Sequence, residues 1–128
     1  MSRAGEAATI ARVRHTVLIV DDHEPFRRAV RELLTVEGYE VVGEAADGAS
    51  GVAAAERLGP AIVLLDVQLP DIDGFEVARR LHAAGHAGVT VLVSGSAGNF
   101  RRRAAESPAA GFILKGDLTG AALAGLVG

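Results

Sequence analysis

The sequence contains no cysteine and no tryptophan, and aromatic residues make up only 4% of the chain. Without cysteine, disulfides and cysteine-ligated zinc are excluded, and the chain fits a reducing compartment such as the cytoplasm. No apolar run is long enough to span a bilayer, and the first residues lack the apolar stretch of a secretory signal. The sequence therefore predicts neither a disulfide framework nor a membrane partner.

An excess of basic residues is also lacking, since the formal net charge is −3. This balance argues against a nucleic-acid-binding surface over the whole chain, so we expect no direct nucleic-acid partner. Apolar residues make up 49% of the 128 residues, which is enough to bury a core. The length fits one domain, which we assign to residues 15–128, preceded by a mobile N-terminal extension over residues 1–14.

Five short apolar runs rich in β-branched residues are predicted to be strands. Several of them are apolar at every position, which is typical of strands that are buried on both faces, as in a parallel sheet. The five predicted strands are Thr16–Val20, Val41–Ala45, Ile62–Leu65, Val89–Val93 and Gly111–Leu114.

Helical patterns lie between these runs. The first has apolar residues on one face from Phe26 to Leu34, with Pro25 near its start and Gly38 just past its end. Four more are expected over about 49–58, from Gly74, over 99–106 and from about Leu118 to the C-terminus. Alternation of strands and helices predicts an α/β fold, a doubly wound five-stranded parallel sheet with helices on both faces, of the flavodoxin-like type.

Polar side chains follow four of the predicted strands, at the edge where parallel sheets bind ligands. Asp21 and Asp22 follow the first strand and Asp66 the third. Ser94 follows the fourth strand and Lys115 the fifth. Clustered carboxylates repel one another unless a cation lies among them, and oxygen ligands suit a hard cation such as Mg²⁺. Carboxylate, cation, lysine and hydroxyl together predict a phosphoryl-transfer site, with an aspartate as nucleophile.

These residues occur in segments that resemble the receiver domain of two-component response regulators. The segment 65–74, Leu-Asp-Val-Gln-Leu-Pro-Asp-Ile-Asp-Gly, is similar to the phosphoacceptor segment of that family. The segments 20–23, 93–95 and 110–115 resemble the acidic pair, the switch hydroxyl and the last strand with its aromatic residue and lysine. The resemblance covers about residues 16–127, and four motifs in the right order on the right strands are specific.

The resemblance implies a role for each matched residue. Asp66 would be phosphorylated by a histidine kinase or a phosphotransfer protein, and Ser94 and Phe112 would move together on activation. The residues implied to hold Mg²⁺ are Asp22 and Asp66, with Asp21 through water and the Gln68 carbonyl. The groups implied to hold the phosphoryl oxygens are Ser94, Lys115 and the backbone amides of Val67 and Gly95.

The resemblance also implies a signalling domain in place of an enzyme, with catalysis limited to its own phosphorylation and dephosphorylation. The partner downstream would be a target protein or an output domain outside this chain, and the activated form could form a homodimer. The sequence departs from the family at Gly116, where a proline usually follows the lysine, and at Ala61, where an aspartate is common. The departure at Gly116 puts the geometry of that loop in question.

Two alternatives from other functional classes stay open. A phosphorylation-independent interaction module would keep only the fold, although the set Asp22, Asp66, Ser94 and Lys115 argues against it. A haloacid-dehalogenase-like phosphatase also uses an aspartate nucleophile, but it needs a second aspartate two positions on, where this chain has Gln68. His15, His82 and His86 are predicted to lie at the surface, and so are the three arginines 101–103.

Overall fold

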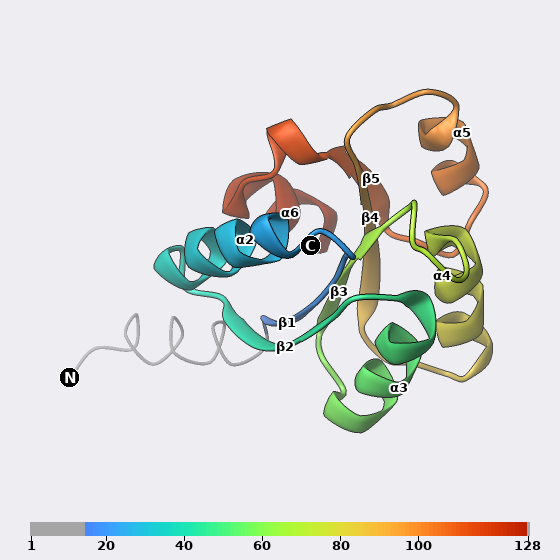
Figure 1. Ribbon diagram of the computed structural model, residues 1–128, viewed down its shortest axis with the longest axis horizontal. Helices are drawn as coiled ribbons and strands as arrows, with labels where there is room; N and C mark the ends of the chain where they lie inside the picture. The colour runs from blue at the N-terminus through green and yellow to red at the C-terminus, as the bar shows by residue number, and fades with distance from the viewer. Residues whose placement is uncertain (1–14, 128) are drawn as a thin grey trace.

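A five-stranded parallel sheet forms the centre of the computed structural model, which describes residues 15–127 (Figure 1). The strands are β1 (Thr16–Val20), β2 (Glu40–Ala45), β3 (Ile62–Asp66), β4 (Val89–Ser94) and β5 (Gly111–Leu114). The predicted extension over residues 1–14 and the last residue of the predicted domain lie outside the described residues. The sequence therefore identified all five strands, and the bounds of β1 and β5 were predicted without error.

The strand order places a crevice beside β1. Neighbouring strands follow the order β2-β1-β3-β4-β5, and each described pair is parallel. The chain adds β2 on one side of β1 and then crosses to add β3 on the other side. Ligands of such sheets bind beyond the carboxyl ends of the strands where the order reverses, which here means between β1 and β3.

Helices cover both faces of the sheet, which confirms the doubly wound fold. The helices α2 (Glu24–Val36) and α6 (Gly120–Val127) lie on one face (Figure 1). The helices α3 (Gly48–Leu58), α4 (Gly74–Ala83) and α5 (Phe100–Ala105) lie on the other (Figure 1). Within residues 15–127 the structure has no helix with the length and apolar character needed to cross a membrane.

Each strand contributes to two separate cores because successive side chains point to opposite faces. In β1, Val17 and Ile19 pack in the core beneath α2 and α6, whereas Leu18 and Val20 pack in the core beneath α3, α4 and α5. All five residues of β3 are buried. Burial on both faces therefore explains why these strands lack alternating polar residues, as the sequence predicted.

The start of α6 differs from the prediction. The helix begins at Gly120, two residues after the predicted Leu118, and a 3₁₀ turn over Lys115–Asp117 comes before it. Thr119 caps the helix, since its hydroxyl accepts a hydrogen bond from the Ala122 amide at 3.0 Å. The Gly120 amide donates to the Glu37 carboxylate at 2.5 Å. A cap and a contact with the end of α2 thus set the start of α6, which the apolar pattern alone does not reveal.

Candidate functional site

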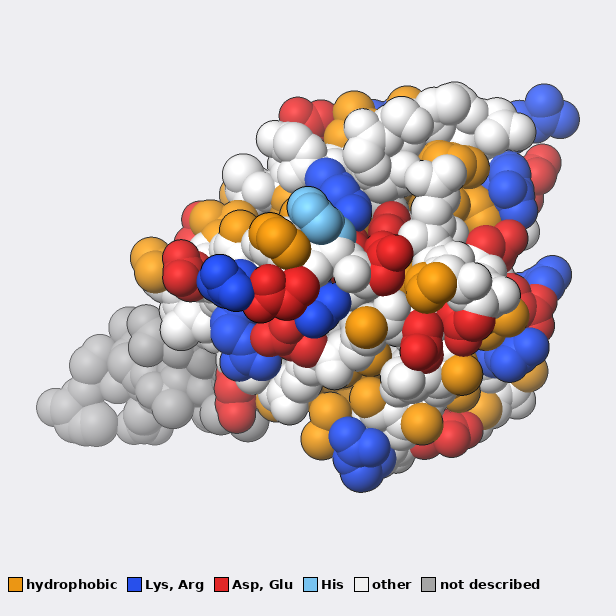
Figure 2. Space-filling model, viewed as in Figure 1, with side chains coloured by type: hydrophobic (Ala, Val, Ile, Leu, Met, Phe, Trp, Pro, Cys, Tyr) orange, Lys and Arg blue, Asp and Glu red, His pale blue; other side chains and the backbone are white. Residues whose placement is uncertain are grey.

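Three carboxylates converge at the crevice between β1 and β3. Asp21, Asp22 and Asp66 each offer an oxygen, and these oxygens lie within 4.8 Å of one another. Asp21 is 0% exposed and Asp66 is 5% exposed, whereas Asp22 is open to solvent. Acidic side chains also gather between the two helix layers on the face seen in Figure 2. The structure thus brings together the three acids that the sequence predicted to meet.

Lys115 supplies a cation to this cluster from the end of β5. Its Nζ atom lies 2.7 Å from Asp21 Oδ2 and 3.6 Å from Asp66 Oδ2. The same Nζ atom lies 4.4 Å from the centre of the Phe26 ring, which fixes its position from the side of α2. Asp21 Oδ2 is buried and accepts no hydrogen bond from the described residues, so its contact with Lys115 is an ion pair alone.

The environment of Asp66 disfavours the ionised form of its carboxyl group. Burial raises the pKa of Asp66 to about 6, and the negative charges of Asp21 and Asp22 add to this effect. The charge of Lys115 and a backbone hydrogen bond from Gln68 lower the pKa, but they do not outweigh the burial. Three carboxylates thus share the single ammonium group of Lys115.

The donor set of this cluster fits a hard divalent cation. All the available ligand atoms are oxygens, two of the carboxylates are buried, and one buried oxygen accepts no hydrogen bond from the described residues. Mg²⁺ binds through one or two carboxylates plus water and phosphate oxygens, and this cluster provides the carboxylates. Asp21, Asp22 and Asp66 are the residues that could hold such an ion.

The loop after Asp66 is shaped by a close approach of the chain at Gly74. The Gly74 amide donates to the Val67 carbonyl at 2.8 Å, and a Cβ atom at position 74 would overlap the Asp66 carbonyl oxygen. Asp73 caps α4, since its carboxylate accepts from the Glu76 amide at 2.8 Å. The aspartate and glycine at the end of the 65–74 segment therefore start the helix directly against the end of β3.

One predicted phosphate ligand, the Val67 amide, has a backbone partner in the structure. The Val67 amide donates to the Val93 carbonyl at 2.9 Å and so continues the pairing of β3 with β4. In this structure that amide is therefore engaged by the sheet. The backbone hydrogen bond that Asp66 accepts comes from Gln68, whose side chain is exposed. The amide that contacts the Asp66 carboxylate is thus one residue further along the chain.

The two predicted switch residues lie at different depths. Ser94 is 1% exposed at the end of β4, and its hydroxyl accepts a hydrogen bond from the Ser96 amide at 3.3 Å. Phe112 is half-buried on β5 and packs against the core beneath α3, α4 and α5. The Arg101 guanidinium lies 5.2 Å from the centre of the Phe112 ring. Arg101, Arg102 and Arg103 are exposed on α5, as predicted.

Three residues near the site had no signal in the sequence. Arg27 and Glu44 form an ion pair beside the acidic cluster, with Nε and Oε1 2.9 Å apart. Asp71 accepts hydrogen bonds from the Gly48 and Ala49 amides at 2.7 and 2.9 Å, which joins the loop after Asp66 to the start of α3. These backbone hydrogen bonds lower the pKa of Asp71 to about 2. Each contact joins residues far apart in the sequence, so no local pattern marks it.

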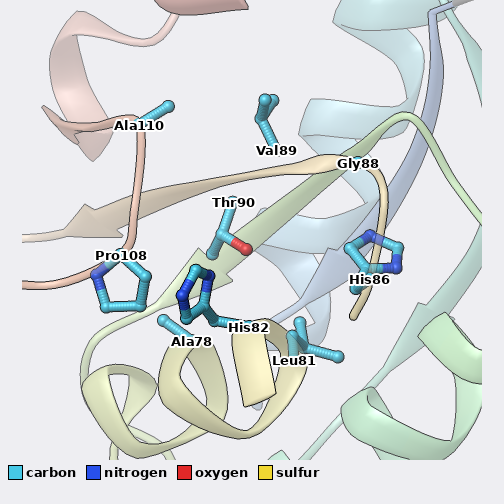
Figure 3. A pocket seen from close by; sticks show the side chains of 9 residues that line it. All are labelled: Ala78, Leu81, His82, His86, Gly88, Val89, Thr90, Pro108 and Ala110. Carbon is cyan, nitrogen blue, oxygen red and sulfur yellow. The ribbon is translucent and has the colours of Figure 1, made fainter. Parts of the chain in front are cut away.

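A small hollow lies away from this cluster, at the end of α4 and the start of β4 (Figure 3). It has a volume of about 120 Å³, and His82, His86 and Thr90 are among the residues that line it. His86, which was predicted to lie at the surface, is half-buried: its Nε2 atom is buried, and burial lowers its pKa. His82 is exposed, as predicted. The hollow contains none of the acidic residues of the cluster.

Comparison with known proteins gives one consistent result. The family model described as the response regulator receiver domain matches residues 17–120. The transcription regulator BvgA of Bordetella pertussis is 44% identical over 77% of this chain and 48% of its own length. The DNA-binding transcriptional activator EvgA of Escherichia coli is 33% identical over 77% of this chain and 48% of its own length. The chain therefore spans about half the length of these curated relatives.

Solved structures agree with the sequence comparison. The signal receiver domain of the response regulator NarL from Mycobacterium tuberculosis is 32% identical, with a TM-score of 0.78 over 88% of this chain and 96% of that one. A complex of CheX with CheY, BeF₃ and magnesium from Borrelia burgdorferi gives a TM-score of 0.77 at 25% identity, over 88% of this chain and 85% of that one. With the matched segment, the sheet order and the acidic crevice in agreement, the chain belongs to the response regulator receiver domain family.

Proposed function

We propose that Asp66 accepts a phosphoryl group from a histidine kinase or a phosphotransfer protein in a reaction that depends on Mg²⁺. A carboxylate oxygen of Asp66 attacks the phosphorus, and the bond to the donor breaks with its electron pair leaving on the donor. The observation that carries this proposal is the buried carboxylate at the end of β3, with Lys115 Nζ at 3.6 Å and two further carboxylates beside it. The product is an aspartyl phosphate.

Asp22 and Asp66 would bind Mg²⁺ directly, with Asp21 acting through water and the Gln68 carbonyl completing the protein ligands. The ion supplies charge neutralisation when it is bound. The convergence of the three carboxylates supports this assignment, and the similar CheY structure is a complex with magnesium and BeF₃. Lys115, Ser94 and the Gly95 amide would hold the phosphoryl oxygens. The Gln68 amide would take the role first expected of Val67, because it already donates to Asp66.

Mass spectrometry tests the acceptor directly. Incubation with acetyl phosphate and Mg²⁺ is expected to add one phosphoryl group, which peptide mapping should locate on Asp66. Asp66→Asn should remove the addition, because an amide oxygen is too weak a nucleophile. Asp71→Asn is the matched control, since it changes a nearby acid that caps a helix, and it should still be labelled. Equal labelling of the Asp66→Asn protein would contradict the assignment.

We further propose that phosphorylation switches a protein-interaction face through Ser94 and Phe112. A phosphoryl oxygen at Asp66 would attract the Ser94 hydroxyl and so open space that Phe112 can fill. A hydrogen bond to a charged group contributes about 1.5–3 kcal/mol, which shifts a two-state population by about tenfold or more. The contact of Arg101 with Phe112 would carry this change to α5.

Nuclear magnetic resonance with beryllofluoride as the phosphoryl mimic tests the switch. In the wild-type protein, resonances of Phe112 and of α5 are expected to shift together with those near Asp66. Ser94→Ala should still bind the mimic, but the shifts at Phe112 should be much smaller. Ser96→Ala is a suitable control, because Ser96 contributes only its backbone amide to the Ser94 hydroxyl. Shifts confined to the surroundings of Asp66 in the wild-type protein would mean that this domain does not switch in this way.

The switched face would bind a downstream target protein or an output domain outside this chain. A third candidate partner is a second copy of the domain, in a homodimer. The relatives BvgA and EvgA are transcription regulators about twice as long as the matched segment, so a DNA-binding partner segment is one candidate. The receiver itself would catalyse only its own phosphorylation and dephosphorylation, in the cytoplasm where its kinase would act. A phosphatase of the dehalogenase type is disfavoured because Gln68 cannot act as a general acid.

A further inference from the structure

The side chain of Arg27 connects the acidic cluster to two other elements. Arg27 lies in the first turns of α2, and its side chain is only 15% exposed. Its Nη1 atom donates to the Asp21 carbonyl at 2.7 Å, and its Nε atom donates to Glu44 Oε1 on β2 at 2.9 Å. One planar guanidinium thus joins the end of β1, α2 and β2. Acidic and basic side chains are interleaved over this part of the surface (Figure 2).

The Asp21 carbonyl has particular importance because it belongs to the peptide unit that leads into Asp22. A peptide unit is planar, so a bond that fixes the Asp21 carbonyl also fixes the Asp22 amide and the direction in which Asp22 leaves the strand. The other groups of Asp21 are already held: its amide donates to Ala45 at 3.0 Å, and its Oδ1 accepts from His23 at 2.8 Å. Arg27 therefore completes the restraint on the acidic pair.

The charge of Arg27 is balanced by Glu44, which lies outside the acidic cluster. Glu44 also accepts a hydrogen bond from Arg31 Nε at 2.6 Å, so one carboxylate faces two guanidinium groups. Although partial burial acts to raise it, the pKa of Glu44 is lowered overall by its hydrogen bonds and charge interactions with Arg31 and Arg27. Arg27 thus contacts the cluster through a backbone carbonyl, and it occupies no carboxylate oxygen of the acidic pair.

We infer that Arg27 is a positioning residue for the divalent cation: it orients the Asp21–Asp22 peptide so that Asp22 projects into the crevice between β1 and β3. This inference rests on the proposed function, because Asp22 is assigned to Mg²⁺ there. The groups that orient metal ligands commonly change metal affinity by about 10–100-fold when they are removed. The geometry places Arg27 in that role through hydrogen bonding to the ligand's own backbone.

The sign of the effect separates positioning from simple electrostatics. Removing a positive charge near a cation site should tighten Mg²⁺ binding, because it removes repulsion. Removing a positioning contact should weaken the binding. Arg31 is the matched control: it shares Glu44, but its hydrogen bonds go to Glu44 and, at a long 3.5 Å, to the Val41 carbonyl, and none goes to Asp21. Arg27→Gln and Arg31→Gln thus remove the same charge from the same ion-pair cluster.

Mg²⁺ titration by calorimetry on the full chain, without any phosphoryl donor, tests this inference. Arg27→Gln is expected to weaken the affinity by about tenfold, whereas Arg31→Gln should bind as the wild type does or slightly more tightly. Asp22→Ala should lose most of the binding. Arg27→Met keeps the packing of the buried stem and replaces Arg27→Gln if that variant does not fold, which the melting temperature without metal reports.

The outcomes distinguish this inference from the proposed function. Equal affinities of the Arg27 and Arg31 variants, or tighter binding by both, would overturn the positioning role and leave the phosphoacceptor proposal standing. Loss of folding in both Arg27 variants would make the role of Arg27 structural and would also overturn it. A wild-type protein that binds no Mg²⁺ would contradict the metal assignment itself, and the role of Arg27 with it.

Discussion

Asp66→Asn is expected to stabilise the metal-free protein at neutral pH, by about 2–3 kcal/mol in the free energy of unfolding. The reason is the pKa of Asp66, which rises from 3.8 to about 6 on folding, mainly through burial and secondarily through the charge of Asp21. Ionised Asp66 therefore opposes folding at neutral pH. Asparagine fills the same space without charge, so the residue that we propose as the phosphoacceptor limits the stability of the metal-free domain.

The sign of the pH dependence follows from proton binding. Between about pH 4 and pH 6 the folded state holds a proton on Asp66 that the unfolded state has released, so the Asp66 contribution to stability falls as pH rises through this window. It is constant below and above the window. Denaturant unfolding at a series of pH values tests this. Across the window, the free energy of unfolding of the wild type should fall relative to that of Asp66→Asn.

Mg²⁺ provides the control for this prediction. Because the ion would bind the folded cluster and not the unfolded chain, it should stabilise the wild-type protein by mass action and close much of the gap to Asp66→Asn. Asp71→Asn controls for the removal of an exposed acid and should lower the stability, since Asp71 has a lowered pKa and caps α3. If Asp66→Asn were less stable than the wild type without metal, ionised Asp66 would not oppose folding and the prediction would be wrong.

The parts of the fold that local chemistry determines could be predicted from the sequence. The continuous apolar run Ile62–Leu65 predicts a strand buried on both faces, because no polar side chain in it needs solvent. The position of Gly38 predicts a helix end, and the structure gives it a φ of 95°, which an L side chain rarely adopts. The convergence of Asp21 and Asp66 also follows, because parallel strands deliver their ends to one edge.

The contacts that depend on tertiary arrangement could not be predicted in this way. The Val67 amide looks like a free loop donor in the sequence, but the sheet extends one residue further and uses it. Arg27 lies 17 residues from Glu44, and nothing in either segment indicates that they pair. A hydrogen bond from α2 to the end of β1 becomes visible only when the helix is placed on the sheet. Sequence patterns therefore predicted which strand ends carry acids, but not which groups orient them.

Gly74→Ala is expected to destabilise the domain by about 2–4 kcal/mol, a large effect for the addition of one methyl group. The Cβ atom would overlap the Asp66 carbonyl oxygen and would lie 3.0 Å from the Val67 Cα atom. Both neighbours are backbone atoms at the end of a fully buried strand, so they cannot turn aside as a flexible side chain could. Either α4 must move off the sheet or the end of β3 must shift.

The same change should also impair phosphoryl uptake at Asp66, because the added Cβ atom would displace the Asp66 backbone itself. We therefore expect Gly74→Ala to lose both its hydrogen bond to Val67 and most of its phosphoryl uptake from acetyl phosphate. Gly125→Ala in α6 is the control: apart from its chain neighbours and the backbone of its own helix, no described atom lies within 4 Å of the added Cβ. Alanine should stabilise that helix by about 0.5–1 kcal/mol. Denaturant unfolding and labelling of the two variants test both effects, which have opposite signs for stability. A Gly74→Ala protein with wild-type stability and labelling would mean that the loop relaxes freely, and that the close approach at position 74 is not what shapes the site.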